Sequence, residues 1–428
     1  MMKRLLLSTG IILLSLAVSA QNYNIVIKGG RVVDPKNNID EVLDIAIKDG
    51  KIARVARNID PGEGIQCVNA KGFYVVPGII DMHVHVFNGT NLDQQYMDGP
   101  NSVPPDGFTF RVGVTTVVDA GCAGWRTFDT FKRQTIDRSK TRVLAFLNIV
   151  GEGMRGGPFE QNILDMNPKR TADFARKHSG DIVGIKLAHY NGRDWTPVKL
   201  AEEASLLADI PLMVDFGGAN PALSLDTLFM QVFRPGDIYT HCFGGSPETG
   251  ETRPGGREAI VNTKGELKPF AWEARKRGIL FDVGYGGSSF NYFQAIPAVK
   301  AGFYPDFIST DLHIGSMNSS MKDILSIMSK FLLMGMDLNS VIRSVTWDPA
   351  RTLKREDLGN LSVGSEADVA ILGMRKGKFG FWDKNGYKME GKRKFECEMT
   401  IKGGQVVYDL NGLAEPLIVM SGRMNRSR

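Results

Sequence analysis

Histidine and cysteine are both scarce in this chain of 428 residues, which has six histidines and four cysteines. No two cysteines form a Cys-x-x-Cys pair, so their spacing excludes a zinc finger. Four cysteines in so long a chain also exclude a disulfide scaffold. Whether any of them pair stays open, and our default expectation is four free, buried thiols, at Cys67, Cys122, Cys242 and Cys397.

An excess of charge of one sign is also lacking, because the formal net charge is only +5. This balance provides no electrostatic reason to expect nucleic acid as a partner. Hydrophobic residues make up 43% of the chain and charged residues 23%, which excludes intrinsic disorder and collagen-like or low-complexity fibres. The length allows one large domain or a few small ones.

Long apolar runs are confined to the N-terminus, where residues 5–17 are largely apolar. Lys3 and Arg4 precede this run and small residues follow it at 18–20, as in a secretory signal peptide. No run approaches the ~18 continuous apolar residues of a membrane-spanning helix. We therefore interpret residues 1–20 as a signal peptide and expect a bacterial periplasmic or secreted protein without stable membrane insertion. An uncleaved N-terminal anchor is the alternative.

The two ends of the chain resemble each other. The sequence IKGGRVV at 27–33 recurs as IKGGQVV at 401–407, and each copy has a Gly-Gly pair between β-forming residues. Such pairs predict hairpins, because these turns require positive φ. Asp49-Gly50 predicts a further hairpin. Extended segments at both ends predict one β-sandwich module built from residues 21–76 and 357–420, although two unrelated hairpins would also explain the pattern.

Between residues 77 and 356, apolar runs typical of strands alternate with helical patterns. This alternation predicts βαβ units and a parallel sheet, hence an α/β fold. Eight units in about 240 residues fit a (β/α)8 TIM barrel better than an open sheet. The strands are expected at 74–86, 114–120, 142–150, 182–187, 211–216, 238–243, 279–283 and 307–310. The helices are expected near 126–138, 163–178, 197–208, 221–233, 265–277, 290–301 and 320–335.

In such a barrel the chemistry lies where strands end, and polar residues end five of these strands. His83 and His85 are two apart, so both side chains face the same side of the first strand and supply half of a zinc site. Lys186 ends the fourth strand, where burial without a partner is costly. A lysine carboxylated on its amine would be an anionic oxygen donor that bridges two ions. Exposure at the rim or pairing with an acid are the alternatives.

Three further residues end strands five, six and eight, namely Asp215, His241 and Asp311. Imidazoles and carboxylates at one end of a barrel are typical of a metal site. The alternative for Asp215 is a purely structural carboxylate, and the alternative for Asp311 is a helix cap.

This set of residues resembles the amidohydrolase superfamily of metal-dependent hydrolases. The resemblance rests on the opening PGIIDMHVH at 77–85, the divided β-module and the sequence EADVA at 366–370, and it covers nearly the whole chain. More narrowly, the chain is similar to the dihydroorotase-like amidohydrolase/deacetylase group through 113–121, 146–151, 281–284 and 309–313. Members of that group resemble hydrolases of acetylated small acids, such as acetyl esters of mandelate-like hydroxy acids.

The resemblance implies a site for two divalent ions, which we expect to be zinc. His83, His85 and Asp311 would bind the more buried ion, and carboxylated Lys186 would bridge to a second ion held by His241. The superfamily usually has a histidine where this chain has Asp215, so the native metal and the occupancy of the second position stay open. Asp311 would also be catalytic, because its carboxylate would accept the proton of the attacking water and pass it to the leaving atom.

Four residues are candidates for substrate contacts: Arg155, in a Gly-rich loop, His189, His313 and Tyr285, which stands where related deacetylases have histidine. We favour a metal-dependent deacetylase, esterase or amidase that uses metal-activated water on a small acylated molecule. A dihydroorotase-like cyclic amidase is less favoured, because Val86-Phe87 replaces the usual x-Arg after the second histidine. A catalytically inactive binding protein is the third hypothesis. Homo-oligomerisation stays open.

Overall fold

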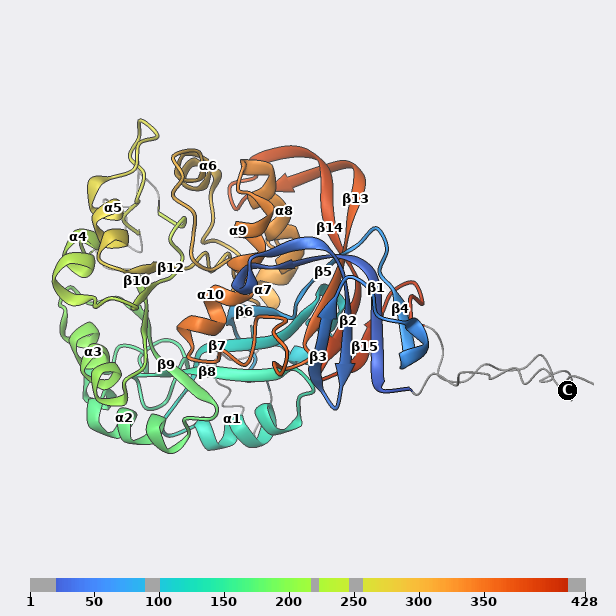
Figure 1. Ribbon diagram of the computed structural model, residues 1–428. Coiled ribbons are helices and arrows are strands. Elements are labelled where there is room, and N and C mark those ends of the chain that lie inside the picture. Colours follow the sequence, from blue (N-terminus) through green and yellow to red (C-terminus); the bar gives the residue numbers. More distant parts are fainter. Residues whose placement is uncertain (1–20, 89–100, 217–222, 246–256, 415–428) are drawn as a thin grey trace, which may run out of the picture.

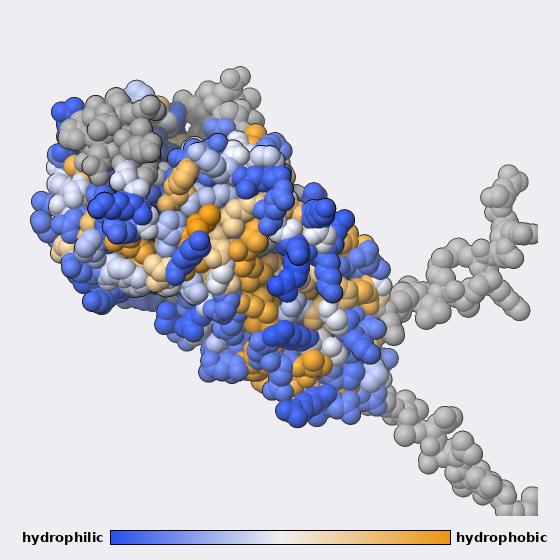
Figure 2. Space-filling model, turned by 90° about the horizontal axis from the view of Figure 1, so that it is seen from above, coloured by the Kyte–Doolittle hydropathy of each residue, from blue (hydrophilic) through white to orange (hydrophobic). Residues whose placement is uncertain are grey.

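The computed structural model describes residues 21–88, 101–216, 223–245 and 257–414, which form two β-sheets and a set of helices (Figure 1). The predicted signal peptide, 1–20, and residues 415–420 of the predicted terminal module lie outside the described residues. None of the four cysteines, all of which lie in described residues, forms a disulfide, and all except Cys67 are buried. Within the described ranges, no helix is long and apolar enough to cross a membrane. Viewed from above, the surface is mostly hydrophilic, with a band of apolar residues across its middle (Figure 2).

One sheet has eight strands and joins the two ends of the chain, whose blue and red segments lie side by side in Figure 1. The strand order is β15-β14-β13-β5-β1-β2-β3, and β4 pairs with β1. Ile27, Val75 and Ile371 belong to one buried cluster, which joins residues of both ends of the chain. The strands are β1 (Tyr23–Asp34), β2 (Ile39–Lys48), β3 (Lys51–Ala56), β4 (Gly64–Asn69), β5 (Tyr74–Pro77), β13 (Val369–Trp382), β14 (Lys388–Lys402) and β15 (Gln405–Asp409).

The repeated Gly-Gly pair has two different structures. Gly403-Gly404 forms the predicted turn between β14 and β15, with φ of 54° and 76°. Gly29 and Gly30 instead lie inside β1, where the pairing with β2 shifts register, so the hairpin predicted there is wrong. Gly29 has a φ of 69°, and its amide donates to Asp44 Oδ1 at 2.8 Å. The two glycines therefore form a β-bulge, whose positive φ glycine adopts without strain. The hairpin predicted at Asp49-Gly50 is confirmed between β2 and β3.

The second sheet has seven parallel strands in the order β12-β11-β10-β9-β8-β7-β6. The eighth predicted strand, 307–310, is not a strand of this sheet. Residues 307–312 make single parallel bridges instead, from Phe307 to Asp282 beside β12 and from Leu312 to Val84 in β6. The strands are β6 (Ile79–Val84), β7 (Val114–Gly124), β8 (Arg142–Asn148), β9 (Ile182–Tyr190), β10 (Leu212–Phe216), β11 (Ile238–Tyr239) and β12 (Leu280–Phe281).

Gly78 separates the two sheets, so the predicted single strand over 74–86 is wrong. β5 ends at Pro77 in the terminal sheet, and β6 begins at Ile79 in the parallel sheet. The Gly78 amide donates to Asp368 O at 2.7 Å. A Cβ atom on Gly78 would lie 2.3 Å from Thr115 Oγ1 and 2.8 Å from Asp368 Cβ, so only glycine fits where the chain crosses between the sheets.

Every predicted helical region contains a helix; α3 matches its predicted range within one residue, and the other helices are shorter than predicted. Several lie along the outside of the parallel sheet in Figure 1 and pack against it through one large buried core. The helices are α1 (Phe128–Gln134), α2 (Pro168–Lys177), α3 (Thr196–Ala208), α4 (Leu225–Thr227), followed by a π-helical turn at Leu228–Val232, α5 (Pro269–Lys276), α6 (Tyr292–Lys300), α7 (Ile314–Met317), α8 (Ile324–Met334), α9 (Leu338–Arg343) and α10 (Trp347–Thr352).

Candidate metal centre

Three of the predicted ligands converge at one point. His83 lies in β6, His85 follows that strand, and Asp311 lies in the segment that bridges to it. One ligand atom from each lies within 4.8 Å of the others. Asp311 Oδ1 is 2.9 Å from His85 Nε2 and 3.7 Å from His83 Nε2. Two imidazole nitrogens and a carboxylate oxygen form a donor set that suits zinc and similar divalent ions.

Buried polar side chains orient His83. Its Nδ1 lies 2.9 Å from Thr240 Oγ1 and 3.2 Å from Asp282 Oδ2. The Thr240 hydroxyl donates to the same carboxylate oxygen, and the Ser309 hydroxyl donates to the other. Metal-binding histidines are typically held through the second ring nitrogen in this way, which leaves Nε2 toward Asp311. Burial lowers the pKa of His83 to about 3, so the ring is neutral and Nε2 keeps its lone pair.

Asp119 holds the backbone around His85. Its buried carboxylate accepts hydrogen bonds from the amides of Val86 and Cys122, both at 2.8 Å. Cys122 Sγ in turn lies 3.3 Å from His85 Nδ1, while Nε2 of the same ring faces Asp311. One carboxylate therefore joins the end of β6 to β7 and positions the second histidine.

Lys186 lies in β9 with only 1% of its surface exposed. Its amine donates to Met213 Sδ at 3.4 Å, and it forms no ion pair within 4 Å with any described carboxylate. Burial lowers the pKa of Lys186, although the charges of Asp215 and Asp311 oppose this effect. The environment therefore favours the neutral amine, which is the form that reacts with carbon dioxide to give a carboxylated lysine.

Asp215, in β10, is surrounded by nitrogen-bearing side chains. Its Oδ1 accepts from Arg257 Nη2 at 2.8 Å, and its Oδ2 lies 3.3 Å from His241 Nε2 and 3.6 Å from His189 Nε2. Arg257 also donates to Ser289 Oγ at 2.7 Å. Burial raises the pKa of Asp215, but Arg257 and His241 outweigh it and hold that pKa well below its usual range. The carboxylate is thus ionised and already paired with a guanidinium.

Three residues of the site have left-handed backbone: His189, His241 and Asp311, with φ of 55°, 57° and 51°. Residues other than glycine adopt this conformation rarely, and it persists where the surrounding structure enforces it, often at functional sites. The His241 side chain is held as well, since its Nδ1 lies 2.6 Å from Gly284 O and its Nε2 lies 3.3 Å from Asp215 Oδ2.

Two of the four predicted substrate residues lie beside the metal donors. His189 is about half exposed (48% of the side chain), and its Nδ1 lies 3.0 Å from Glu160 Oε1, while its Nε2 approaches Asp215. His313 caps α7, and its ring lies 6.1 Å from the ring of His85 between centroids. Both rings border the site, and His189 has the more accessible position.

The structure places the other two candidates differently. Arg155 Nη1 donates to Glu152 Oε2 at 2.9 Å, and its guanidinium lies over the ring of Phe159, so its described contacts are within its own loop. Tyr285 is fully buried, and its hydroxyl donates to Trp382 O at 2.8 Å. The expected substrate contact of Tyr285 is therefore corrected, because its hydroxyl is directed to the β13–β14 hairpin.

A model of the amidohydrolase family matches residues 286–407. A protein of Brucella anthropi named deacetylase is 33% identical over 377 residues, which cover 86% of this chain and 88% of that protein. The chain belongs to the amidohydrolase family. It is similar to a crystal structure titled adenine deaminase (30% identity, TM-score 0.79, 91% and 100% of the two chains) and to one titled dihydroorotase (30%, TM-score 0.77, 90% and 99%). The protein is therefore a hydrolase.

Several residues at the site of this amidohydrolase were missed from the sequence. Asp119 and Asp282 are carboxylates inside apolar strand patterns, the same signal that singled out Lys186, and they could have been found in that way. Arg257 had no such signal, because it follows a Gly- and Pro-rich stretch and lies 42 residues from Asp215.

Proposed function

We propose that this amidohydrolase is a metal-dependent deacylase, which hydrolyses an acyl ester or amide of a small organic acid. The convergence of His83, His85 and Asp311 carries the proposal, since both Nε2 atoms face the carboxylate and both Nδ1 atoms have partners. The deacetylase name of the Brucella anthropi relative supports an acetyl group as the one removed.

We propose two zinc or similar divalent ions per chain. The first would be held by His83, His85 and Asp311, whose buried donors are preoriented. The second would be held by His241 and Asp215, with carboxylated Lys186 bridging the two ions. The second position is the weaker one, because Asp215 would have to exchange its ion pair with Arg257 for the metal.

When bound, the ions would lower the pKa of a water molecule to near neutrality and polarise the acyl carbonyl. Asp311 performs the proton transfer: one of its oxygens accepts the proton of the attacking water and then gives it to the leaving oxygen or nitrogen. His83 stays neutral, so its Nε2 lone pair is available to the metal ion beside Asp311. His189, the most exposed ring at the site, is positioned to contact the substrate acid.

Three related proposals concern the whole chain. We infer that residues 307–312 close the parallel sheet into a (β/α)8 barrel over 77–356, since single bridges link this segment to both edges. We propose that residues 21–76 and 357–420 form the β-sandwich module. Residues 1–20 act as an export signal to the periplasm or the exterior.

The test is a screen of O-acetylated hydroxy acids, N-acetyl amino acids and dihydroorotate on protein purified without chelators. Hydrolysis of acetylated acids that disappears in His85→Asn would support the proposal. Hydrolysis of dihydroorotate alone would replace it with the cyclic-amidase function. Absence of bound metal, even after incubation with zinc and bicarbonate, together with absence of hydrolysis, would indicate a binding protein.

A further inference from the structure

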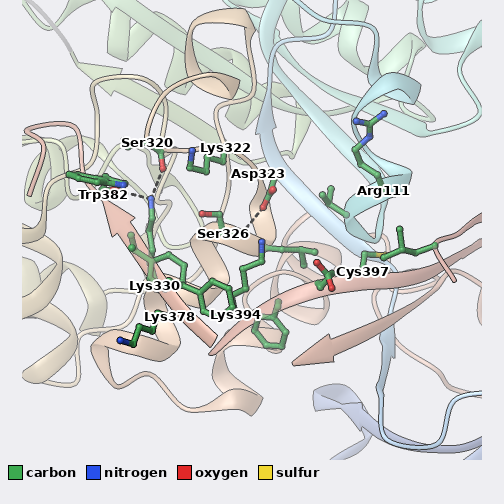
Figure 3. Close-up of a pocket in the computed structure, with 18 of the residues that line it drawn as sticks. Arg111, Ser320, Lys322, Asp323, Ser326, Lys330, Lys378, Trp382, Lys394 and Cys397 are labelled. Atoms are coloured by element: carbon green, nitrogen blue, oxygen red, sulfur yellow. Dashed lines mark hydrogen bonds between the residues drawn. The ribbon is translucent and has the colours of Figure 1, made fainter. Parts of the chain in front are cut away.

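A cavity of about 490 Å³ lies between α8 and the long hairpin of β13 and β14 (Figure 3). None of the proposed metal ligands lines it. Its walls include aromatic side chains, among them Phe379, Phe381 and Phe395. Five basic residues also line it, namely Arg111, Lys322, Lys330, Lys378 and Lys394.

The carboxylates of this cavity do not balance its positive charge. Asp323 Oδ1 accepts from the Ser326 amide at 2.7 Å and so caps α8, and Glu396 pairs with Arg375 at 3.3 Å. In Figure 3 the amine of Lys394 points toward Asp323. The charges of Lys322 and Lys330 also act on this carboxylate, so one acid is shared by three lysines. Among the described residues, no ion pair within 4 Å is formed by Arg111, Lys322, Lys378 or Lys394.

Lys330 is the buried member of this group, with 1% of its surface exposed. Its amine donates to Tyr285 Oη at 2.7 Å, Ser320 O at 2.6 Å and Trp382 O at 2.9 Å. These partners are neutral, and burial, with a contribution from Lys322, lowers the pKa of Lys330 to about 7, although the charges of Asp323 and Asp383 oppose this effect. In the described ranges of the chain Lys330 forms no ion pair within 4 Å, so a bound anion would add counter-charge close to its amine.

We propose that this cavity, which we call the lysine cavity, binds a small organic anion with a compact, multiply charged group such as a phosphate. Lys322, just before α8, and Lys394, on β14, would hold the charged group as point charges, and the buried Lys330, within α8, would add to the positive potential. Aromatic walls of low polarity strengthen such an attraction, and the five basic residues outnumber the two carboxylates, Asp323 and Glu396, that line the same cavity. Phe379 and Phe395 would contact the apolar part of the ligand.

The test measures binding of inorganic phosphate and of phenyl phosphate to the full-length protein by calorimetry, with sodium chloride at matched ionic strength. The variant Lys322→Met/Lys394→Met removes two cavity lysines. Its matched control, Lys376→Met/Lys392→Met, removes two exposed lysines of the β13–β14 hairpin that do not line the cavity. Both variants carry the same net charge, so a difference between them reports the cavity alone.

We expect the control to bind each probe as tightly as the wild type does. The cavity variant should bind each probe at least about tenfold more weakly, as expected for a lost charge-assisted hydrogen bond. Phenyl phosphate should bind more tightly than phosphate. Equal binding by both variants would place the anion elsewhere, for example at the metal centre, and would overturn the proposal. Absence of binding of either probe at millimolar concentrations would also overturn it. A cooperative thermal unfolding transition near that of the wild type would verify that the cavity variant folds.

Discussion

Replacing Arg257 tests whether its guanidinium competes with the second metal ion. Arg257→Met keeps much of the side-chain volume but removes the charge that pairs with Asp215 at 2.8 Å. A divalent ion at His241 and Asp215 would be repelled by the guanidinium and would have to break this ion pair. The variant should therefore bind the second ion more tightly than the wild type.

The size of the effect follows from the contact. Two unit charges about 4 Å apart attract by about 4 kcal/mol at an effective dielectric constant of about 20. Hydration of the released groups offsets part of this, so we expect a gain of about 1.5–3 kcal/mol, or roughly 10- to 100-fold in affinity. Without metal, the buried Asp215 carboxylate loses its partner, and the stability of the apoprotein should fall by about 3–5 kcal/mol. Added metal should restore it by mass action.

Elemental mass spectrometry after equilibrium dialysis against zinc measures the stoichiometry, and thermal unfolding with and without zinc measures the stability. The matched control is Arg54→Met, an exposed arginine of β3 with the same change in charge. If Arg257→Met and the control bind the same number of ions at every zinc concentration, Arg257 does not compete for this position. If zinc does not restore the stability of Arg257→Met, Asp215 is not a metal ligand.

Three further substitutions test the surroundings of the site and the lysine cavity. Gly121→Ala would place a Cβ atom 2.6 Å from Lys186 Cγ at a φ of +95°, so we expect a loss of about 1–3 kcal/mol in stability and of bound metal, measured by unfolding and elemental analysis. Asp282→Asn weakens the hold on His83 Nδ1 and should lower metal affinity about 10- to 100-fold; unchanged affinity in a zinc titration would contradict its positioning role. The unfolded chain keeps the proton of Lys330 up to about pH 10, whereas burial lowers its pKa in the folded protein to about 7. The free energy of unfolding should therefore rise with pH across this interval by up to about 1.4 kcal/mol per unit, and in Lys330→Met this rise should disappear from denaturant unfolding curves.

The local sequence determined most helices and strands of this protein and the side of the strand from which its two histidine ligands project. Alternation along a strand has a period of two, which predicted that His83 and His85 face the same side, although β6 ends at Val84, just before His85. The apolar run that precedes them predicted that both histidines lie at the end of a strand. The apolar runs and helical patterns likewise predicted the parallel sheet, because these periodicities act over a few neighbouring residues.

The same local patterns could not distinguish two backbone conformations that use the same residues. The Gly-Gly pairs at 29–30 and 403–404 have nearly identical neighbours, yet one is a bulge and the other a turn. In both copies the first glycine donates to a carboxylate, Gly29 to Asp44 and Gly403 to Asp368. The difference therefore lies in the strand pairing: β1 continues along β2 through the bulge, whereas β14 turns back onto β15. Similarly, the break at Gly78 depends on Thr115 and Asp368, which are distant in sequence.

Only the tertiary structure decided how the charges of the site are balanced. Asp215 was recognisable as a strand-end carboxylate, but its pairing with Arg257 depends on a loop that returns to the site after β11. Tyr285 was predicted to face the substrate, whereas packing turned its hydroxyl to the hairpin at Trp382. Electrostatic and hydrogen-bond partners act through space over a few ångströms, so residues far apart in the chain become neighbours only when the whole fold has formed.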